Sequence, residues 1–136
     1  MSEPAGAVEQ QLWDLVYAYD AAFDRAAQEA GLTAAQACLL TTLSAGSCMM
    51  GDLATQLLCD ASNVTQIVGR LEARGLVVRE PDEHDRRARR VSITDEGQRQ
   101  RQAFERVFGF PSERIGRLSE TEQRRLRDLL AKLLAD

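Results

Sequence analysis

Five polar residues in the middle of the chain have side chains that could pair with the edges of bases. They fall at helical spacing on one face of a segment, 62–74, that is expected to be a helix: Ser62, Asn63, Thr65, Gln66 and Arg70. Asn and Gln amides pair with adenine, an Arg fork pairs with guanine, and Thr contacts a thymine methyl group or a phosphate. Val64, Ile67, Val68 and Leu71 form the opposite, apolar stripe. The pattern predicts a helix that packs on one side and reads bases on the other.

A second cluster is basic and follows shortly afterwards. Arg86, Arg87, Arg89 and Arg90 lie within five positions, between two segments, 76–79 and 90–93, that are expected to be strands. The guanidinium fork suits phosphates and guanine edges. We expect Arg87 at the tip of a hairpin, near a minor groove whose negative potential attracts it. For Arg86 and Arg89 we expect contact either with phosphates or only with solvent.

The elements that must position these side chains are mostly helices. Thr33 with Gln36, and Ser119 with Glu122, form capping boxes that begin helices. The apolar spacing predicts helices over about 8–28, 33–44, 50–58, 62–74, 95–108 and 119–134. Gly31 and Gly75 end two of them, Thr94 caps the helix from Asp95, and a break falls at Gly109-Phe110-Pro111. Helix, turn, helix and a two-stranded hairpin in this order predict a winged helix-turn-helix.

Charge is distributed unevenly over the 136 residues. The net charge is −4, yet 16 of the 17 basic residues are Arg, and residues 1–60 contain one base, Arg25, against eight acids. Residues 61–94 carry a net +2. The acidic total therefore leaves a local basic region for a nucleic-acid partner.

The central segments also resemble a known family. Asp85–Gly97 is similar to the wing signature of MarR-type transcriptional regulators, with its D-x-R, alternating strand, Thr and Gly. Asp52–Ala54 and Val64–Val77 resemble the helix-turn-helix of that family. Leu118–Glu122, followed by a Leu-rich helix, is similar to its C-terminal dimerisation helix.

This resemblance implies a mainly α fold and one domain over 1–136. The winged helix-turn-helix with its antiparallel hairpin would cover about 33–94, and dimerisation helices about 8–30 and 95–136. It also implies a homodimer with two recognition helices one duplex turn apart, which bind a pseudo-palindromic operator. Arg87 would be the wing-tip arginine and Asp85 the carboxylate that orients it. We expect a repressor that a small ligand releases from double-stranded DNA.

Candidate effector residues are few. Trp13, Tyr17, Tyr19 and Phe23 recur at helical spacing and could line an effector pocket, but aromatic residues at such spacing favour the core or a dimer interface, and we prefer the core. Cys38 lies beside Leu39 and Leu40, where a small buried hydrophobe is the simplest interpretation. Trp13, Tyr17, Phe23 and Cys38 remain the effector candidates.

A cysteine-based redox sensor of the same fold is an alternative. Cys59 precedes the predicted recognition helix, whose dipole would lower the pKa of a thiol at that end. The sequence has no C-x-x-C, so we expect no structural zinc, and His84 is expected to be a solvated turn residue. We expect neither a metal nor a cofactor.

Other classes of function find little support. The chain has no Gly-rich phosphate loop, no G-x-S-x-G, no H-E-x-x-H and a single His, so we do not expect an enzyme. A winged helix used only for protein contacts would present a more apolar face. No apolar run approaches the roughly 20 residues of a membrane span, and no signal peptide is visible. Three cysteines favour a reducing cytoplasm over a disulfide framework.

Overall fold

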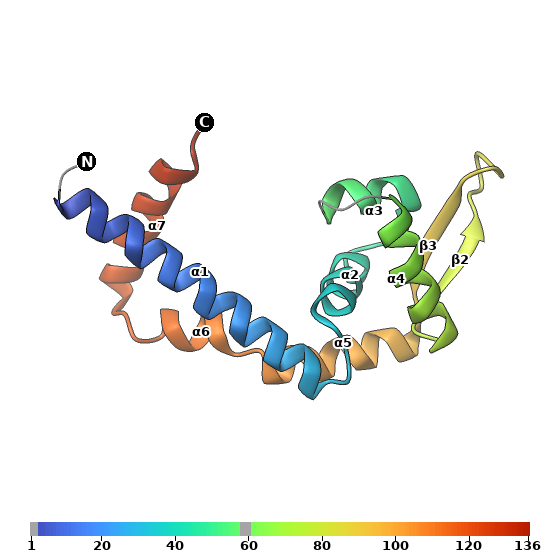
Figure 1. Cartoon of the computed structure of the whole chain (residues 1–136), viewed down its shortest axis with the longest axis horizontal. Helices are drawn as coiled ribbons and strands as arrows, with labels where there is room; N and C mark the ends of the chain where they lie inside the picture. Colours follow the sequence, from blue (N-terminus) through green and yellow to red (C-terminus); the bar gives the residue numbers. More distant parts are fainter. Residues whose placement is uncertain (1–2, 58–60) are drawn as a thin grey trace. The chain divides into compact units, whose positions relative to one another are not determined.

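The computed structural model of the chain describes residues 3–57 and 61–136, except for the side chains of residues 61 and 62. It consists of two compact units (Figure 1). One unit is Phe23–Val107, and the other combines Met1–Ala22 with Phe108–Asp136. Helix α1 (Glu3–Glu29) contributes residues to both units and begins five residues before its predicted start. None of the described helices is long and apolar enough to span a membrane.

The central unit contains the predicted helix-turn-helix. Helix α2 (Ala34–Ser44) begins with the predicted capping box, in which the Thr33 side chain accepts from the Gln36 amide and the Gln36 side chain accepts from the Thr33 amide. The short α3 (Met50–Gln56) and α4 (Ala61–Ala73) follow. Helix α5 (Asp95–Val107) begins at the predicted cap, where the Gly97 amide donates to Thr94 Oγ1 at 3.0 Å.

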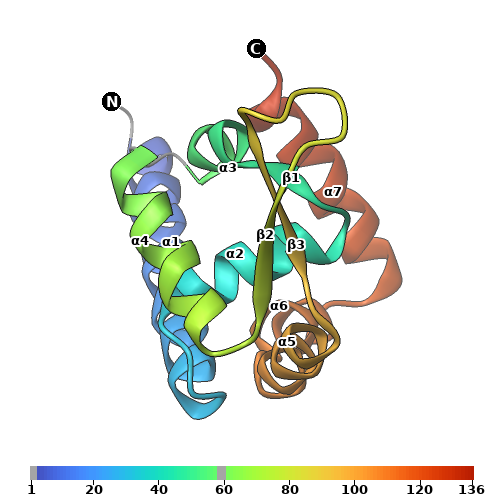
Figure 2. The same ribbon diagram turned by 90° about the vertical axis from the view of Figure 1, so that its right-hand side faces the viewer.

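A three-stranded antiparallel sheet completes the central unit. Strands β2 (Val77–Pro81) and β3 (Arg89–Ile93) form the predicted hairpin, and their loop lies at the end away from α5 (Figure 2). The two-residue β1 (Cys48–Met49) pairs with β3 and was not predicted. Met49 also occupies the N-cap position of α3 without a side-chain cap. Its backbone lies in the sheet, which explains why a poor capping residue stands there.

The core of this unit comes from its helices and from the two strands of the hairpin. Helix α4 buries the predicted stripe except Ile67, which is half-buried, and the fully buried side chains elsewhere come from α2, α3 and the hairpin: Leu39, Leu40, Leu43, Leu53, Val77 and Val91. Each such side chain contributes about 1.5–3 kcal/mol through burial. Cys38 was expected among them, but it lies on the exposed face of α2. Because Leu39 and Leu40 face the core, the preceding Cys38 falls on the opposite side of the helix.

Two glycines end helices as predicted. Gly31 and Gly75 both have φ of +75°, a conformation that costs glycine little. After α4, the Leu76 amide donates to the Leu71 carbonyl at 3.0 Å and the Gly75 amide donates to the Glu72 carbonyl at 3.0 Å. This pair of bonds is a Schellman motif, which turns the chain directly into β2.

The second unit is formed by the first part of α1, α6 (Phe110–Ile115) and α7 (Glu120–Leu134). The break at residues 109–111 is confirmed: Pro111 lies in the first turn of α6. Ser119 and Glu122 form the predicted capping box of α7. Tyr19 packs edge-on against Phe108 and Phe110 at centroid distances of 5.3 and 5.9 Å.

The expectation that the aromatic residues of α1 form a core within the chain is wrong for most of them. Trp13 and Tyr17 are 52% and 66% exposed, and Tyr19 is also exposed. The apolar residues of α7 are exposed as well: Leu126, Leu129, Leu130, Leu133 and Leu134. The helical stripes are present as predicted, but most of their large side chains are exposed.

The start of α5 gives a first test of the fold. A Cβ at Gly97 would lie 2.1 Å from the Leu76 carbonyl oxygen and 2.7 Å from Ile93 Cγ1. We therefore expect Gly97→Ala to lower the free energy of unfolding by about 1–3 kcal/mol, because the backbone at Leu76 or in α5 must move to make room for the methyl group. Urea unfolding followed by circular dichroism measures this change.

Gly69→Ala, on α4, is the matched control. An added Cβ there meets no atom within 4 Å, and alanine favours a helix over glycine by about 1 kcal/mol. Equal effects of the two substitutions on stability would contradict the packing of α5 described above.

Candidate nucleic-acid interface

Helix α4 presents the predicted reading face to solvent. Val64, Val68 and Leu71 are fully buried, and this fixes the rotation of the helix about its axis. Asn63, Thr65, Gln66 and Arg70 are all exposed on the opposite side. Ser62 was predicted to join them, but its side chain lies outside the described residues. The exposed donors and acceptors therefore form one polar face on a helix that cannot rotate without exposing its core side.

Two arginines anchor the C-terminal part of α4 and do not join that face. The Arg79 guanidinium contacts Glu72 Oε1 at 2.8 Å through Nη2, and the Arg79 amide donates to Oε2 of the same carboxylate at 3.2 Å. The side-chain hydrogen bond from Arg79 holds the pKa of Glu72 below its ordinary value. Arg74 Nη1 donates to the Gly31 carbonyl at 3.0 Å. These contacts attach the helix to β2 and to the turn before α2.

The tip of the hairpin is an ordered turn. The Ala88 amide donates to the Asp85 carbonyl at 3.0 Å, and Asp85 Oδ1 accepts from the Arg87 amide at 3.1 Å. Asp85 thus orders the backbone at Arg87; its influence on the Arg87 guanidinium remains a prediction. Arg86, Arg87 and Arg89 are all exposed. The loop and the first residue of β3 therefore present three guanidinium groups from an ordered backbone.

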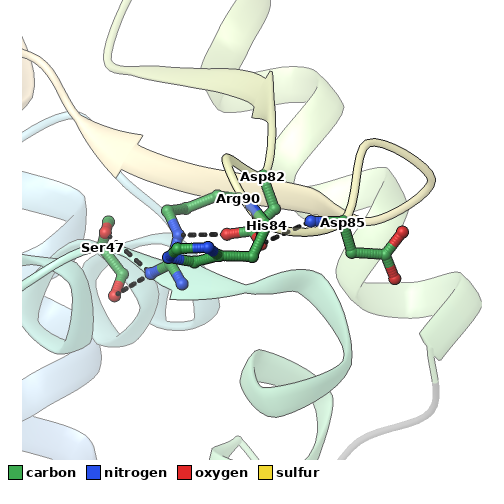
Figure 3. A network of polar contacts seen from close by, with 5 residues as sticks. All are labelled: Ser47, Asp82, His84, Asp85 and Arg90. Carbon is green, nitrogen blue, oxygen red and sulfur yellow. Dashed lines mark hydrogen bonds and ion pairs between the residues drawn. The ribbon is translucent and has the colours of Figure 1, made fainter.

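Asp82 holds this loop from inside and was not singled out from the sequence. It is only 8% exposed, and its Oδ2 accepts from the amides of His84 and Asp85, each at 3.1 Å. Its Oδ1 accepts from Arg90 Nε at 3.1 Å (Figure 3). The hydrogen bond from Arg90 lowers the pKa of Asp82, with smaller contributions in the same direction from the two amides. An Asp that opens a turn and accepts from following amides is a recognisable Asx signal.

Arg90 differs from the other members of the basic cluster. Its Nη1 donates to Ser47 Oγ at 3.0 Å and to the Ser47 carbonyl at 3.3 Å (Figure 3). Ser47 stands between α2 and β1. Four arginines that look equivalent in sequence thus divide into three that face solvent and one that joins the wing to the start of the helix-turn-helix.

The four predicted effector residues are divided between the units. Trp13 and Tyr17 stack at 6.0 Å in one unit, whereas Phe23 packs on Phe104 at 4.8 Å in the other, which also contains the exposed Cys38 on α2. A groove of about 550 Å³ lies elsewhere, and it is lined by residues of α6, α7 and their connection: Ile115, Leu118, Glu120, Gln123, Arg124, Leu126, Arg127 and Leu130. The effector site remains a prediction.

The remaining candidates concern cysteine and metal chemistry. Cys59 lies outside the described residues. Within the part of the chain that the structure describes, no three His, Cys, Asp or Glu residues are grouped so as to hold a metal ion. His84 is exposed in the wing loop, where its amide contacts Asp82.

A helix pair, a polar second helix and an Arg-tipped hairpin define a winged helix-turn-helix. Residues 30–88 match the sequence model of the MarR family. The transcriptional activatory protein BadR of Rhodopseudomonas palustris is 42% identical over 77 residues, which cover 54% of this chain. That match spans 44% of BadR, less than half of its length.

Solved structures agree on the fold. Bordetella bronchiseptica BpsR, whose DNA binding is regulated by 6-hydroxynicotinic acid, is 27% identical, with a TM-score of 0.73 over 95% of this chain and 94% of that chain. A cysteine-to-serine mutant of Escherichia coli MarR, complexed with operator DNA, is 23% identical, with a TM-score of 0.75 over 95% and 94%; this likeness concerns the fold alone. The present chain therefore has the winged helix-turn-helix fold of these structures, and its residues 30–88 are similar to the MarR family.

The contact between Glu72 and Arg79 predicts a pH dependence. Arg79 lowers the pKa of Glu72 in the folded chain. The stabilisation is therefore present above the ordinary glutamate pKa and is lost as the pH falls through the lowered value. We expect Glu72→Gln to lower the melting temperature at about pH 7 and to lower it by less at about pH 3, where protonation has begun to remove the stabilisation. Calorimetry at both pH values measures the two differences.

Glu9→Gln, on the exposed side of α1, removes the same charge as a control. A loss of stability in Glu72→Gln that is equally large at low pH, or that Glu9→Gln reproduces, would mean that the ion pair with Arg79 is not its source.

Proposed function

We propose that this chain is a transcriptional regulator that binds double-stranded DNA in a sequence-specific way. The observation that carries the proposal is the fixed rotation of α4, which buries its apolar stripe and exposes Asn63, Thr65, Gln66 and Arg70. The ordered, arginine-tipped hairpin supports it. The alternative is a module that docks on another protein. It is disfavoured because the exposed face of α4 and the tip of the hairpin are both polar and charged.

In this proposal α4 enters the major groove. Asn63 and Gln66 pair with adenine, Arg70 pairs with guanine, and Thr65 contacts a thymine methyl group or a phosphate. Ser62 joins them at the start of the helix. Arg87 reaches the minor groove from the wing, where Asp85 orders its backbone, and Arg86 and Arg89 contact phosphates.

The active species is a homodimer in the cytoplasm. The large apolar side chains exposed on α1 and α7 support this proposal, since a patch of this kind is rare on a monomer. Because a two-fold dimer repeats each recognition helix, its DNA site is a pseudo-palindrome with half-sites one duplex turn apart.

We further propose a repressor that a small ligand releases from its operator. BadR is named a transcriptional activatory protein. Whether this chain represses or activates transcription therefore has to be measured separately from its binding to DNA. Regulation of BpsR by a small molecule supports the ligand, for which Trp13, Tyr17, Phe23 and Cys38 are the candidate contacts. Oxidation of Cys59 is the alternative signal. We propose no enzymatic activity, metal or cofactor.

Selection of duplexes from a random pool by the purified, reduced protein tests the central proposal. We expect enrichment of a pseudo-palindrome and an affinity that falls steeply with salt as counterions are released. Absence of any enriched sequence would contradict sequence-specific binding. Adding candidate ligands or peroxide to the selected complex then separates the two signals.

The base-reading role of α4 can be separated from the role of the wing. Arg70→Ala is expected to relax the preference at one base position by about 1–3 kcal/mol, because one bidentate contact is lost. Arg87→Ala is expected to weaken binding to all sequences alike and to reduce the salt slope by about 1. Equilibrium titration of a set of single-base operator variants measures both effects.

Arg106→Ala, at the exposed end of α5, removes a charge outside the interface and serves as the control. The proposed roles of Arg70 and Arg87 would be wrong if both variants bound every duplex as the unchanged protein does.

The homodimer is tested on α7. Replacing the exposed Leu129 and Leu133 together by Ser removes apolar surface from the proposed interface. We expect dissociation into monomers and a large loss of operator affinity, since a single recognition helix then acts alone. Sedimentation equilibrium gives the mass.

Asp128→Ser, on the same helix and also exposed, is the matched polar substitution and is expected to remain dimeric. A doubly substituted protein that stays dimeric would place the interface elsewhere.

A further inference from the structure

The wing contains an acidic residue whose position is unexpected beside a polyanion. Among the residues that the structure describes, Asp82 is the one buried side chain that carries a formal charge. A buried carboxylate is costly unless donors compensate it. Here three N–H groups do so: the His84 and Asp85 amides and Arg90 Nε. The carboxylate is thus built into the loop as an acceptor.

These contacts close the loop on both sides of the basic tip. The Asp82 amide donates to the Ala88 carbonyl at 3.1 Å, while the Asp82 carboxylate binds the amides of residues 84 and 85. Arg86 and Arg87 lie between these fixed points. Without the carboxylate, the loop would lose three of the bonds that define its conformation, and the two guanidinium groups would have to be ordered when DNA binds.

Arg90 extends the same network out of the wing. It lies on the central strand, opposite Glu80 on β2 and Met49 on β1. Its guanidinium binds Asp82 on one side and Ser47 on the other. Because β1 leads directly into α3, this bridge fixes the loop relative to the start of the helix-turn-helix.

We propose that Asp82 and Arg90 are positioning residues for DNA binding: they hold the wing tip, relative to the helix-turn-helix, in the conformation that meets the duplex. The inference rests on the function proposed above. For the effect of removing the Asp82 carboxylate on DNA affinity, it predicts the opposite sign to the one expected from charge alone. Removing a negative charge close to DNA increases affinity when only charge matters. Removing this carboxylate decreases it.

The test compares two substitutions of equal charge in the same loop. Asp82→Asn removes the carboxylate and leaves one acceptor oxygen, whereas Glu83→Gln neutralises the exposed neighbour. With the selected duplex, we expect Asp82→Asn to bind about three- to tenfold more weakly than the unchanged protein, which corresponds to ordering about one more side chain on binding. Glu83→Gln is expected to bind equally or more tightly. Binding by Asp82→Asn as tight as that of Glu83→Gln would overturn the inference.

Substitution of Arg90 provides an independent test. Arg90→Gln is expected to weaken binding without changing the salt slope, and its effect combined with Asp82→Asn is expected to be less than additive. A salt slope reduced by about 1 would instead show that Arg90 contacts a phosphate itself, and would overturn its positioning role. Arg90→Lys distinguishes the two further: it retains a phosphate contact but cannot reach both Asp82 and Ser47 with a fork.

Two measurements keep the inference separate from folding and from the proposed function. Melting curves of each variant establish that the fold is retained, and amide hydrogen exchange at His84 and Asp85 in the free protein is expected to accelerate in Asp82→Ala, which leaves no side-chain acceptor for these amides. Unchanged exchange would overturn the ordering role. If the unchanged protein selects no DNA, the proposed function fails and this inference fails with it. If the unchanged protein binds and Asp82→Asn binds as tightly as Glu83→Gln, only this inference fails.

Discussion

The burial of Val64, Val68 and Leu71 is the constraint on which the interface depends. These side chains occupy one stripe of α4, and their removal from water fixes the angle at which the helix lies on the core. All other properties of the polar face follow from that angle, because Cβ directions around a helix are set once its rotation is set. A helix that could turn about its axis would present Asn63 and Arg70 in no fixed direction.

The core of the central unit also fixes what its surface contacts can do. Glu72 with Arg79, Arg74 with the Gly31 carbonyl, and Arg90 with Ser47 each join segments that the core has already brought together. Partly exposed contacts of this kind, the ion pair of Glu72 with Arg79 and the hydrogen bonds of Arg74 and Arg90, contribute little to overall stability. Their effect is local: they determine which arginines are engaged within the fold and which remain for a ligand.

The terminal unit has a different physical character. The apolar stripes of α1 and α7 are largely exposed in the single chain, although both helices are well defined by capping and periodicity. An apolar stripe at helical spacing is thus buried in α4, whereas the corresponding stripes of α1 and α7 are left largely uncovered. The exposed leucines along α7 and aromatic residues along α1 are the surface that the second copy in the proposed function would cover.

The sequence alone determined most of the local elements and the polar face of α4. Both capping boxes, the glycines that end α1 and α4, the break at residue 109, the hairpin and the exposed residues of α4 follow from spacing and local chemistry. Only the tertiary structure decided the contacts between distant segments: β1 pairing with β3, the absence of room for a Cβ at Gly97, and the separation of Arg90 from its neighbours through Asp82 and Ser47. The outward position of Cys38 and the exposure of Trp13 and Tyr17 also depended on it. Periodicity reports which side of an element is apolar, but what covers that side is set by packing among residues far apart in the chain.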